Sequence, residues 1–119
     1  MPLIKTAALV PPALDWAVAK CLGATKIQPY EYNGRGFLRL YLDGGIHAPW
    51  EPSRYWNQGG PIIEREWIEL GAYHDQWRAV FHGEDGSIYQ DGPTPLIAAM
   101  RCFVASKLGD EIDVPEELL

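Results

Sequence analysis

The sequence lacks the features that mark membrane and secreted proteins. No apolar run approaches the roughly 20 residues that a membrane-spanning helix needs. The first residues, Met1 to Lys5, contain neither the apolar core nor the cleavage site of a secretory signal. Only two cysteines are present, Cys21 and Cys102, and we expect both to be buried free thiols. These absences predict a cytoplasmic protein.

Motifs of catalysis and metal binding are also missing. The three histidines are irregularly spaced, and there is no H-E-x-x-H, Cys-x-x-Cys or Gly-x-Ser-x-Gly sequence. Tyr73-His74-Asp75 places a carboxylate beside an imidazole, but neighbouring residues on a strand point to opposite sides. Glu64, Glu66 and Glu69 fit a solvated helix start and a strand edge better than a catalytic cluster. We therefore expect no enzymatic activity, no cofactor and no metal ion.

Basic residues are few. The chain has 10 Lys and Arg against 16 Asp and Glu, which gives a net charge of -6. Five of the acids lie in residues 110–119, so the rest of the chain is nearly neutral. Duplex nucleic acid is normally bound by a basic face that displaces counterions, and single strands by a positive groove. The composition disfavours both, and it predicts one domain, residues 1–119, with a solvated acidic tail at residues 110–119.

Among the features that are present, capping signals define two helices. Pro11-Pro12 begins a helix over residues 12–22 that stops at Gly23. Thr94 is a side-chain N-cap with proline after it, and this second helix, residues 94–108, ends at a glycine. Both helices have an apolar stripe at helical spacing. They are the clearest elements of the sequence.

Turn signals define two hairpins. Asn33-Gly34 joins two β-compatible runs, residues 26–32 and 35–42, and a Gly-Glu-Asp-Gly turn joins residues 77–82 to 87–90. A further short strand is expected over residues 67–70. The sequence therefore predicts an α+β fold, in which an antiparallel sheet from the two hairpins is packed by the N-terminal and C-terminal helices.

Two surfaces of these helices suggest contacts beyond the apolar stripes. Trp16 falls on the outward face of the first helix, where a loop or another chain would have to cover it. The back of the second helix carries small uncharged residues instead of the lysines and glutamates of a solvated face. These are Ala98, Ala99, Cys102, Ala105 and Ser106. We interpret this back as the contact surface of a homo-oligomer.

The most unusual stretch runs from Trp56 to Glu66, at the end of a long predicted loop over residues 43–60. Gly59 and Gly60 allow positive φ angles and a close approach of the backbone, and Pro61 suits the first position of a short helix. We expect a turn whose exposed backbone N–H groups bind a ligand, because loops of this length are usually functional or mobile.

Aromatic and basic residues around this turn suggest the class of ligand. Indole and phenol rings stack on planar rings, whereas guanidinium groups hold phosphates. The candidate ligand-binding residues are Trp50, Arg54, Tyr55, Trp56, Gln58, Gly59 and Gly60, with Arg35, Arg39 and Arg65 as phosphate ligands. A second interpretation stays open, in which the tryptophans fill the core and the arginines pair with nearby carboxylates.

Three segments resemble the NinX-like family of lambdoid and related bacteriophages. They are residues 13–21 (ALDWAVAKC), residues 56–66 (WNQGGPIIERE), and residues 92–102 (GPTPLIAAMRC) with the ending PEELL. The resemblance implies a fold like the small phage α/β/α sandwich domains and an accessory gene product that acts in the cytoplasm of an infected bacterium. The family brings no established catalytic residues, so it implies none here.

These observations favour a non-catalytic binding protein. The first hypothesis is a pocket for a small nucleotide-like ligand, which would let the protein sequester a host immune signal. The alternative is a protein-interaction module that modulates a host or phage protein through Trp16, the back of the second helix and the acidic tail.

Overall fold

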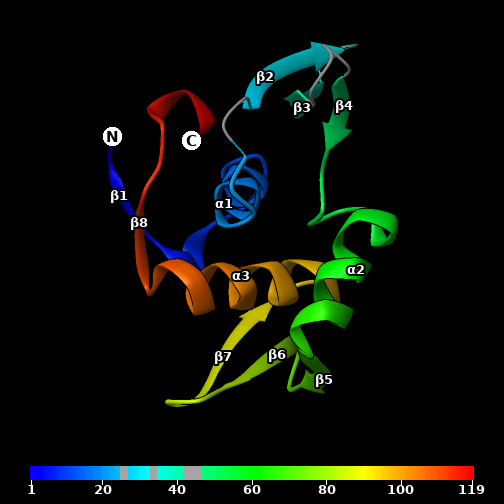
Figure 1. The fold of residues 1–119 in the computed structure, drawn as a ribbon, viewed down its shortest axis with the longest axis vertical. Helices are drawn as coiled ribbons and strands as arrows, with labels where there is room; N and C mark the ends of the chain where they lie inside the picture. The colour runs from blue at the N-terminus through cyan, green and yellow to red at the C-terminus, as the bar shows by residue number, and fades with distance from the viewer. Residues whose placement is uncertain (25–26, 33–34, 42–46) are drawn as a thin grey trace.

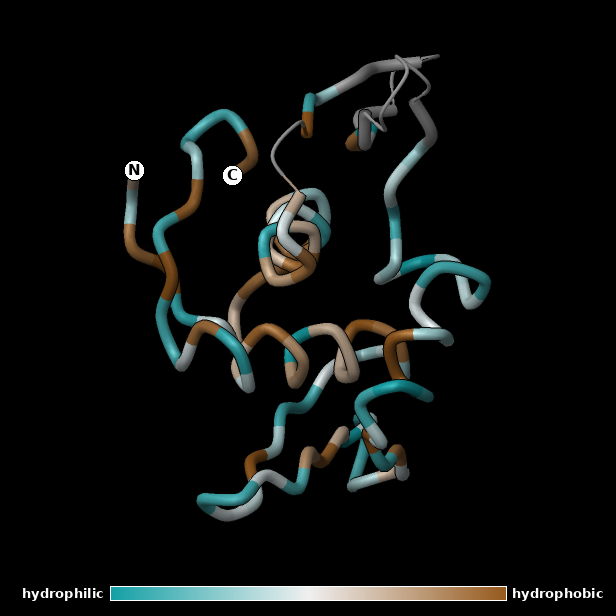
Figure 2. The backbone as a smooth tube through the Cα atoms, viewed as in Figure 1, coloured by the Kyte–Doolittle hydropathy of each residue, from teal (hydrophilic) through white to brown (hydrophobic). Residues whose placement is uncertain are grey.

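A computed structural model describes residues 1–24, 27–32, 35–41 and 47–119. Its central element is helix α3 (Pro95–Leu108), which crosses the middle of the molecule with elements on both sides (Figure 1). The side chain of Thr94 accepts a hydrogen bond from the N–H of Ile97 at 3.1 Å, and Gly109 is the C-cap, so the predicted helix boundaries are confirmed. Figure 2 shows that α3 is apolar along most of its length.

The sheet on one side of α3 has the order β5-β6-β7 and is antiparallel throughout (Figure 1). Its strands are Glu69–Tyr73, Gln76–Gly83 and Gly86–Gly92. Ala79 is fully buried beneath α3, and Phe81 and Ile88 pack against the same core. The predicted hairpin is confirmed, whereas the short strand expected at residue 67 begins at Glu69, because Trp67 caps the preceding helix at a φ of 55°.

A second antiparallel sheet, β2-β3-β4, lies on the other side of α3 (Figure 1). Its strands are Ile27–Tyr32, Arg35–Tyr41 and His47–Trp50, and Tyr32 pairs with Arg35 across the predicted hairpin. The turn residues 33–34 and the loop residues 42–46 lie outside the described residues. The expected loop over residues 43–60 is wrong in part, since strand β4 and the first residues of helix α2 (Trp56–Glu66) fall within it.

The α+β class is confirmed, but the two hairpins do not share one sheet. A helix with a charged back can cover one sheet only, whereas α3 has fully buried residues around its circumference and accepts a layer on each side. The expected oligomer surface on its back is wrong for the same reason. Ala98, Ala99 and Cys102 are completely buried within the chain, where α3 contacts α1, β6 and β7.

Helix α1 (Ala13–Cys21) packs on α3 through Leu14 and Val18, both fully buried. Trp16 is half-buried against the same core, and the Nζ atom of Lys20 lies 5.8 Å from the centre of its ring. The chain itself therefore covers much of the indole that the sequence places on an outward face.

The acidic C-terminal segment folds back onto the start of the chain, so the prediction of a wholly solvated tail is wrong. Strand β8 (Glu111–Asp113) pairs with β1 (Leu3–Lys5), and two short 3₁₀ helices, Thr6–Ala8 and Glu116–Leu118, complete this edge of the molecule. Every acidic side chain of the segment is exposed, whereas three apolar ones are buried: Ile112, Val114 and Leu118. Successive side chains of an extended segment point to opposite sides, so its acidic side chains face water while its apolar ones face the core.

Candidate functional site

The diglycine sequence lies inside α2 and forms no turn. Neither Gly59 nor Gly60 has a positive φ, and the N–H of Gly59 donates to the carbonyl of Tyr55 at 2.9 Å. The expected row of free backbone donors is therefore absent at this position. Gly59 is required for packing, because a Cβ atom there would lie 2.7 Å from Cδ2 of Leu96 and would collide with the carbonyl oxygen of Pro52.

The segment before α2 is fastened to α1 by hydrogen bonds. The indole Nε1 of Trp50 donates to the main-chain oxygen of Asp15 at 2.9 Å, and the N–H of Ser53 donates to Oδ1 of the same residue at 2.9 Å. Gln58 holds this segment from the other end: its Oε1 accepts from the N–H of Glu51 at 2.6 Å, and its Nε2 donates to the carbonyl of Pro49 at 2.8 Å. Trp50 and Gln58 thus hold the segment in place.

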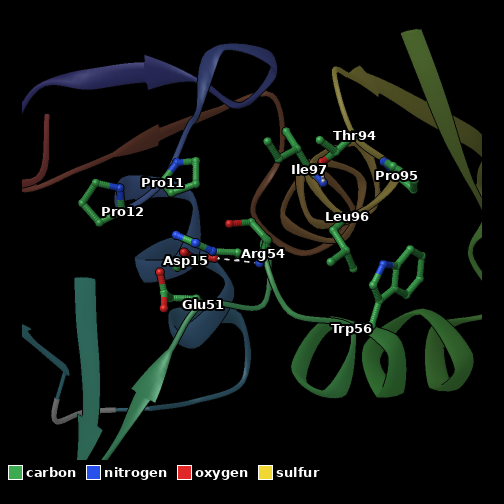
Figure 3. A pocket seen from close by; sticks show the side chains of 11 residues that line it. Pro11, Pro12, Asp15, Glu51, Arg54, Trp56, Thr94, Pro95, Leu96 and Ile97 are labelled. Atoms are coloured by element: carbon green, nitrogen blue, oxygen red, sulfur yellow. Dashed lines mark hydrogen bonds between the residues drawn. The ribbon is translucent and has the colours of Figure 1, made fainter. Parts of the chain in front are cut away.

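A cleft of about 500 Å³ opens between the segment before α2, the start of α1 and the N-terminal turn of α3. Figure 3 shows Arg54 and Trp56 on different sides of it, with Leu96 and Ile97 between them. The remaining lining residues are Pro11, Pro12, Asp15, Glu51, Ser53, Thr94 and Pro95. The Trp56 side chain is 54% exposed, so its ring is accessible at the edge of the cleft.

The structure therefore brings two of the ten predicted ligand-binding residues, Arg54 and Trp56, to the cleft. Tyr55 is exposed beside them, with the Cζ atom of Arg54 5.5 Å from the centre of its ring, but it does not line the cleft. Trp50, Gln58, Gly59 and Gly60 do not line it either.

The predicted phosphate ligands do not gather there. Arg65 is on the last turn of α2, where its Nε lies 3.2 Å from Oε2 of Glu66. Arg39 is a half-buried residue of β3 and is not part of the lining, and the side chain of Arg35 lies outside the described residues. Arg39 on β3 and Arg65 on α2 therefore do not join Arg54 at the cleft.

Two carboxyl groups of the cleft were not predicted from the sequence. Asp15 is 2% exposed and Glu51 is 7% exposed. Burial raises the pKa of the Asp15 carboxyl to about 6, the hydrogen bond from the Ser53 N–H opposes that rise, and the charge of Glu51 adds to it. One signal was available in the sequence: Asp15 lies next to Leu14 in the apolar first turn of α1, where a solvated carboxylate is out of place.

Comparison with known families identifies the chain. The sequence model described as "Bacteriophage P22, NinX" matches residues 5–107. The chain belongs to this NinX family. No curated protein matches it. A crystal structure of a phage protein from Bacillus cereus ATCC 14579 is similar in fold, with a TM-score of 0.61 and 15% identity over 83% of this chain and 88% of that one.

The NinX family membership confirms the resemblance read from the three sequence segments, and the solved phage protein supports the fold. Among the residues that the structure describes, no helix is long and apolar enough to cross a membrane.

Proposed function

We propose that this NinX-family protein is a non-catalytic binding protein whose cleft holds a small nucleotide-like ligand. The observation that carries the proposal is the cleft of about 500 Å³ in which an accessible indole, Trp56, and a guanidinium, Arg54, border apolar walls. Ligand sites of this kind are usually concave and mostly apolar, with a few polar groups that orient the ligand.

Each group of the cleft has a role in this proposal. A planar base stacks on Trp56, an interaction worth about 1–3 kcal/mol per base in nucleic-acid-binding proteins. Arg54 is exposed and makes no ion pair with any described residue, so its N–H groups are available to a phosphate or another anionic group. Leu96 and Ile97 exclude water from the face of the ligand between them.

The charge of the lining narrows the ligand class. The described lining has one basic side chain, Arg54, against the carboxyl groups of Asp15 and Glu51. A polyphosphate or a cyclic dinucleotide would bring two or more negative charges to a site that neutralises only one. The cleft therefore favours a nucleoside or a cyclic mononucleotide, whose phosphodiester carries a single negative charge, over a nucleoside monophosphate, whose phosphate carries about two.

A phage protein of this kind acts by sequestration in the cytoplasm of the infected bacterium. Holding a host immune nucleotide requires affinity and concentration but no catalytic group, which fits the absence of catalytic motifs from the sequence. A single chain supplies both the indole and the guanidinium of the proposed site.

Isothermal titration calorimetry tests the proposal with nucleosides, nucleoside monophosphates, cyclic nucleotides and ADP-ribose-type nucleotides as ligands. We expect heat with nucleosides and cyclic mononucleotides, and native mass spectrometry of protein purified from infected cells should detect a retained ligand. Trp56→Ala should weaken binding at least tenfold without unfolding the chain. Trp67→Ala is the matched control, because Trp67 is 85% exposed and lies outside the cleft. Absence of heat with every ligand, together with no retained nucleotide, would refute the proposal.

The alternative function is the binding of a host or phage protein. The exposed indole of Trp67 favours this alternative. Large aromatic side chains dominate the energetics of protein interfaces. In that case Trp67→Ala, and not Trp56→Ala, would abolish co-purification of the partner from infected cells. The two substitutions thus separate the two functions.

A further inference from the structure

Strand β5 is an edge strand with unpaired backbone groups. Within the part of the chain that the structure describes it pairs with β6 only, and the pair Tyr73–Gln76 closes a two-residue turn. The residues that close such a turn exchange both backbone hydrogen bonds, and hydrogen-bonded pairs alternate along an antiparallel ladder. Gly71 and Glu69 therefore also bond to β6. The N–H and C=O groups of Leu70 and Ala72 point away from β6, towards the open edge.

Strand β5 contains no lysine, no proline and no bulge, and its one charged side chain is Glu69. Sheet edges are commonly blocked by lysine, proline or a bulge. The sequence of β5 is Glu-Leu-Gly-Ala-Tyr, its register with β6 is unbroken, and all of its residues except the half-buried Leu70 are exposed. A shallow hollow of about 210 Å³ lies along it, lined by the five β5 residues with Arg78 and Val80. The outward N–H and C=O groups of this edge can hydrogen-bond to a second extended strand.

The two ends of β5 are complementary to each other. Glu69 presents a carboxylate that is 71% exposed, with His82 at 3.1 Å. At the other end, the Cζ atom of Arg78 lies 3.6 Å from the centre of the Tyr73 ring. Arg78 is opposite Gly71 on β6, and its guanidinium is bound to Asp91 and lies 3.9 Å from the centre of the Tyr89 ring, so the donor that this end presents is the Tyr73 hydroxyl.

Gly71 is the midpoint between these acceptor and donor ends. A Cβ atom at this position would meet no atom within 4 Å, so the space above it is open. An antiparallel copy of the same strand, centred on Gly71, would place each acceptor end opposite a donor end. A parallel copy would place like ends together.

We propose that β5 pairs antiparallel with β5 of a second copy of this chain, about a two-fold axis at Gly71. Leu70 then exchanges backbone hydrogen bonds with the partner's Ala72, and Glu69 lies opposite the partner's Tyr73. The two copies form a continuous six-stranded sheet with a self-complementary interface. The contact at the axis is a non-hydrogen-bonded pair with Cα atoms about 4.5 Å apart, a spacing that suits glycine.

The interface is short, so the dimer is reversible. Five residues from each chain cover far less than the roughly 800 Å² per partner of a standard stable interface. Sedimentation equilibrium should show a mass that rises with concentration from the chain mass of 13.4 kDa towards twice that value. This contact is independent of the cleft, since no β5 residue lines it.

Disulfide trapping tests the geometry. In a Cys21→Ser background, Gly71→Cys places two thiols at the axis within the Cα distance that a disulfide requires. The matched control is Ser87→Cys, an equally exposed position on β7 at the far edge of the same sheet. We expect the Gly71→Cys protein to form a covalent dimer at least tenfold faster under mild oxidation. Equal rates for the two variants would overturn the proposal.

A second pair of variants tests the backbone contact. Ala72→Pro removes an outward N–H and leaves the ladder with β6 intact, whereas Ala72→Val keeps that N–H. We expect sedimentation to show at least a tenfold weaker dimer for the proline variant only, with unchanged circular dichroism for both. A wild-type chain that remains monomeric up to millimolar concentration contradicts the proposal, and so does a proline variant that dimerises normally.

Discussion

Gly59 and Gly60 are neighbours in α2 but have different surroundings. A Cβ atom at Gly59 would meet Pro52 and Leu96, whereas the nearest atom to a Cβ at Gly60 is a ring carbon of Trp56 at 3.9 Å, an ordinary contact. Neither residue needs a positive φ, but Gly60 directly precedes Pro61, whose ring restricts the residue before it.

The first prediction uses this pair of glycines. Gly60→Ala should leave the stability of the protein within about 1 kcal/mol of the wild type, because the helix propensity gained by alanine is offset by contact of its Cβ atom with the ring of Pro61. Gly59→Ala should destabilise it by about 1–3 kcal/mol, because overpacking outweighs that gain. Urea unfolding of both variants measures the two free energies. Equal effects of the two substitutions would show that α2 does not pack closely on Pro52.

Asp15 is the side chain whose protonation matters most for stability. Its pKa is raised from 3.8 to about 6 in the folded state, so the folded protein binds a proton more tightly than the unfolded chain does. The favourable contribution of the protonated form is complete below pH 3.8, and it is lost as the pH rises through about 6.

We therefore expect the unfolding free energies of Asp15→Asn and of the wild type to diverge as the pH rises. The amide keeps an oxygen for the N–H of Ser53 but carries no charge. Between pH 4 and pH 7.5, the wild type should lose about 3 kcal/mol of unfolding free energy relative to the variant, an order-of-magnitude value from the size of the shift. Unfolding curves at several pH values measure the difference. Parallel pH profiles would contradict the raised pKa.

Among the secondary-structure elements, α3 depends on a buried cation that joins it to its neighbours. Arg101 is 9% exposed; its Nε donates to the carbonyl of Leu9 at 2.9 Å, and its Nη1 donates to the carbonyl of Asp91 at 2.8 Å. One side chain thus fixes the segment before α1 and the end of β7 on the same helix. Burial also lowers the pKa of this guanidinium.

Replacing this side chain should loosen both connections. Arg101→Met leaves two carbonyl groups without their donor, and we expect a loss of about 2–4 kcal/mol in unfolding free energy. Lys107→Met is the matched control on the same helix, because Lys107 is partly exposed and pairs with Glu66 near the surface, where such pairs are worth about 0–1 kcal/mol. Equal losses in the two variants would mean that the Arg101 contacts are not specific.

At the scale of the whole molecule, residues 2–6 and residues 109–114 hold each other in place. The N–H of Val114 donates to the carbonyl of Pro2 at 3.0 Å, and Thr6 donates through its backbone N–H to the carbonyl of Asp110 and through its hydroxyl to that of Gly109, each at 2.7 Å. Ile112, Val114 and Leu118 are buried together with Leu9 in the core. The C-terminal segment is therefore a structural part of the domain, with its charges directed to solvent.

A chain shortened to end at Gly109 should be much less stable. Loss of three buried apolar side chains, each worth about 1.5–3 kcal/mol, predicts a fall of at least about 4 kcal/mol. Glu116→Gln with Glu117→Gln is the control, since both side chains are exposed and should matter little. Thermal unfolding compares the three proteins. A shortened chain as stable as the control would mean that the segment is only loosely attached.

The sequence alone located the two helices and both hairpins. Thr94-Pro95, the glycine stops and the Asn-Gly and Gly-Glu-Asp-Gly turns act on their immediate neighbours, so their effects can be read without a fold. Three matching segments also identified the phage family. These properties depend on short-range conformational preference or on sequence similarity.

Tertiary structure decided where those elements lie and what they contact. It placed the hairpins on opposite sides of α3, enclosed Gly59-Gly60 in a helix, dispersed the arginines, and brought Asp15 and Glu51 to the cleft with Arg54 and Trp56. Such contacts join residues far apart in the chain, and their energy depends on the shapes of the packed surfaces. No local pattern encodes those shapes, so the composition of the cleft follows only from the packed structure.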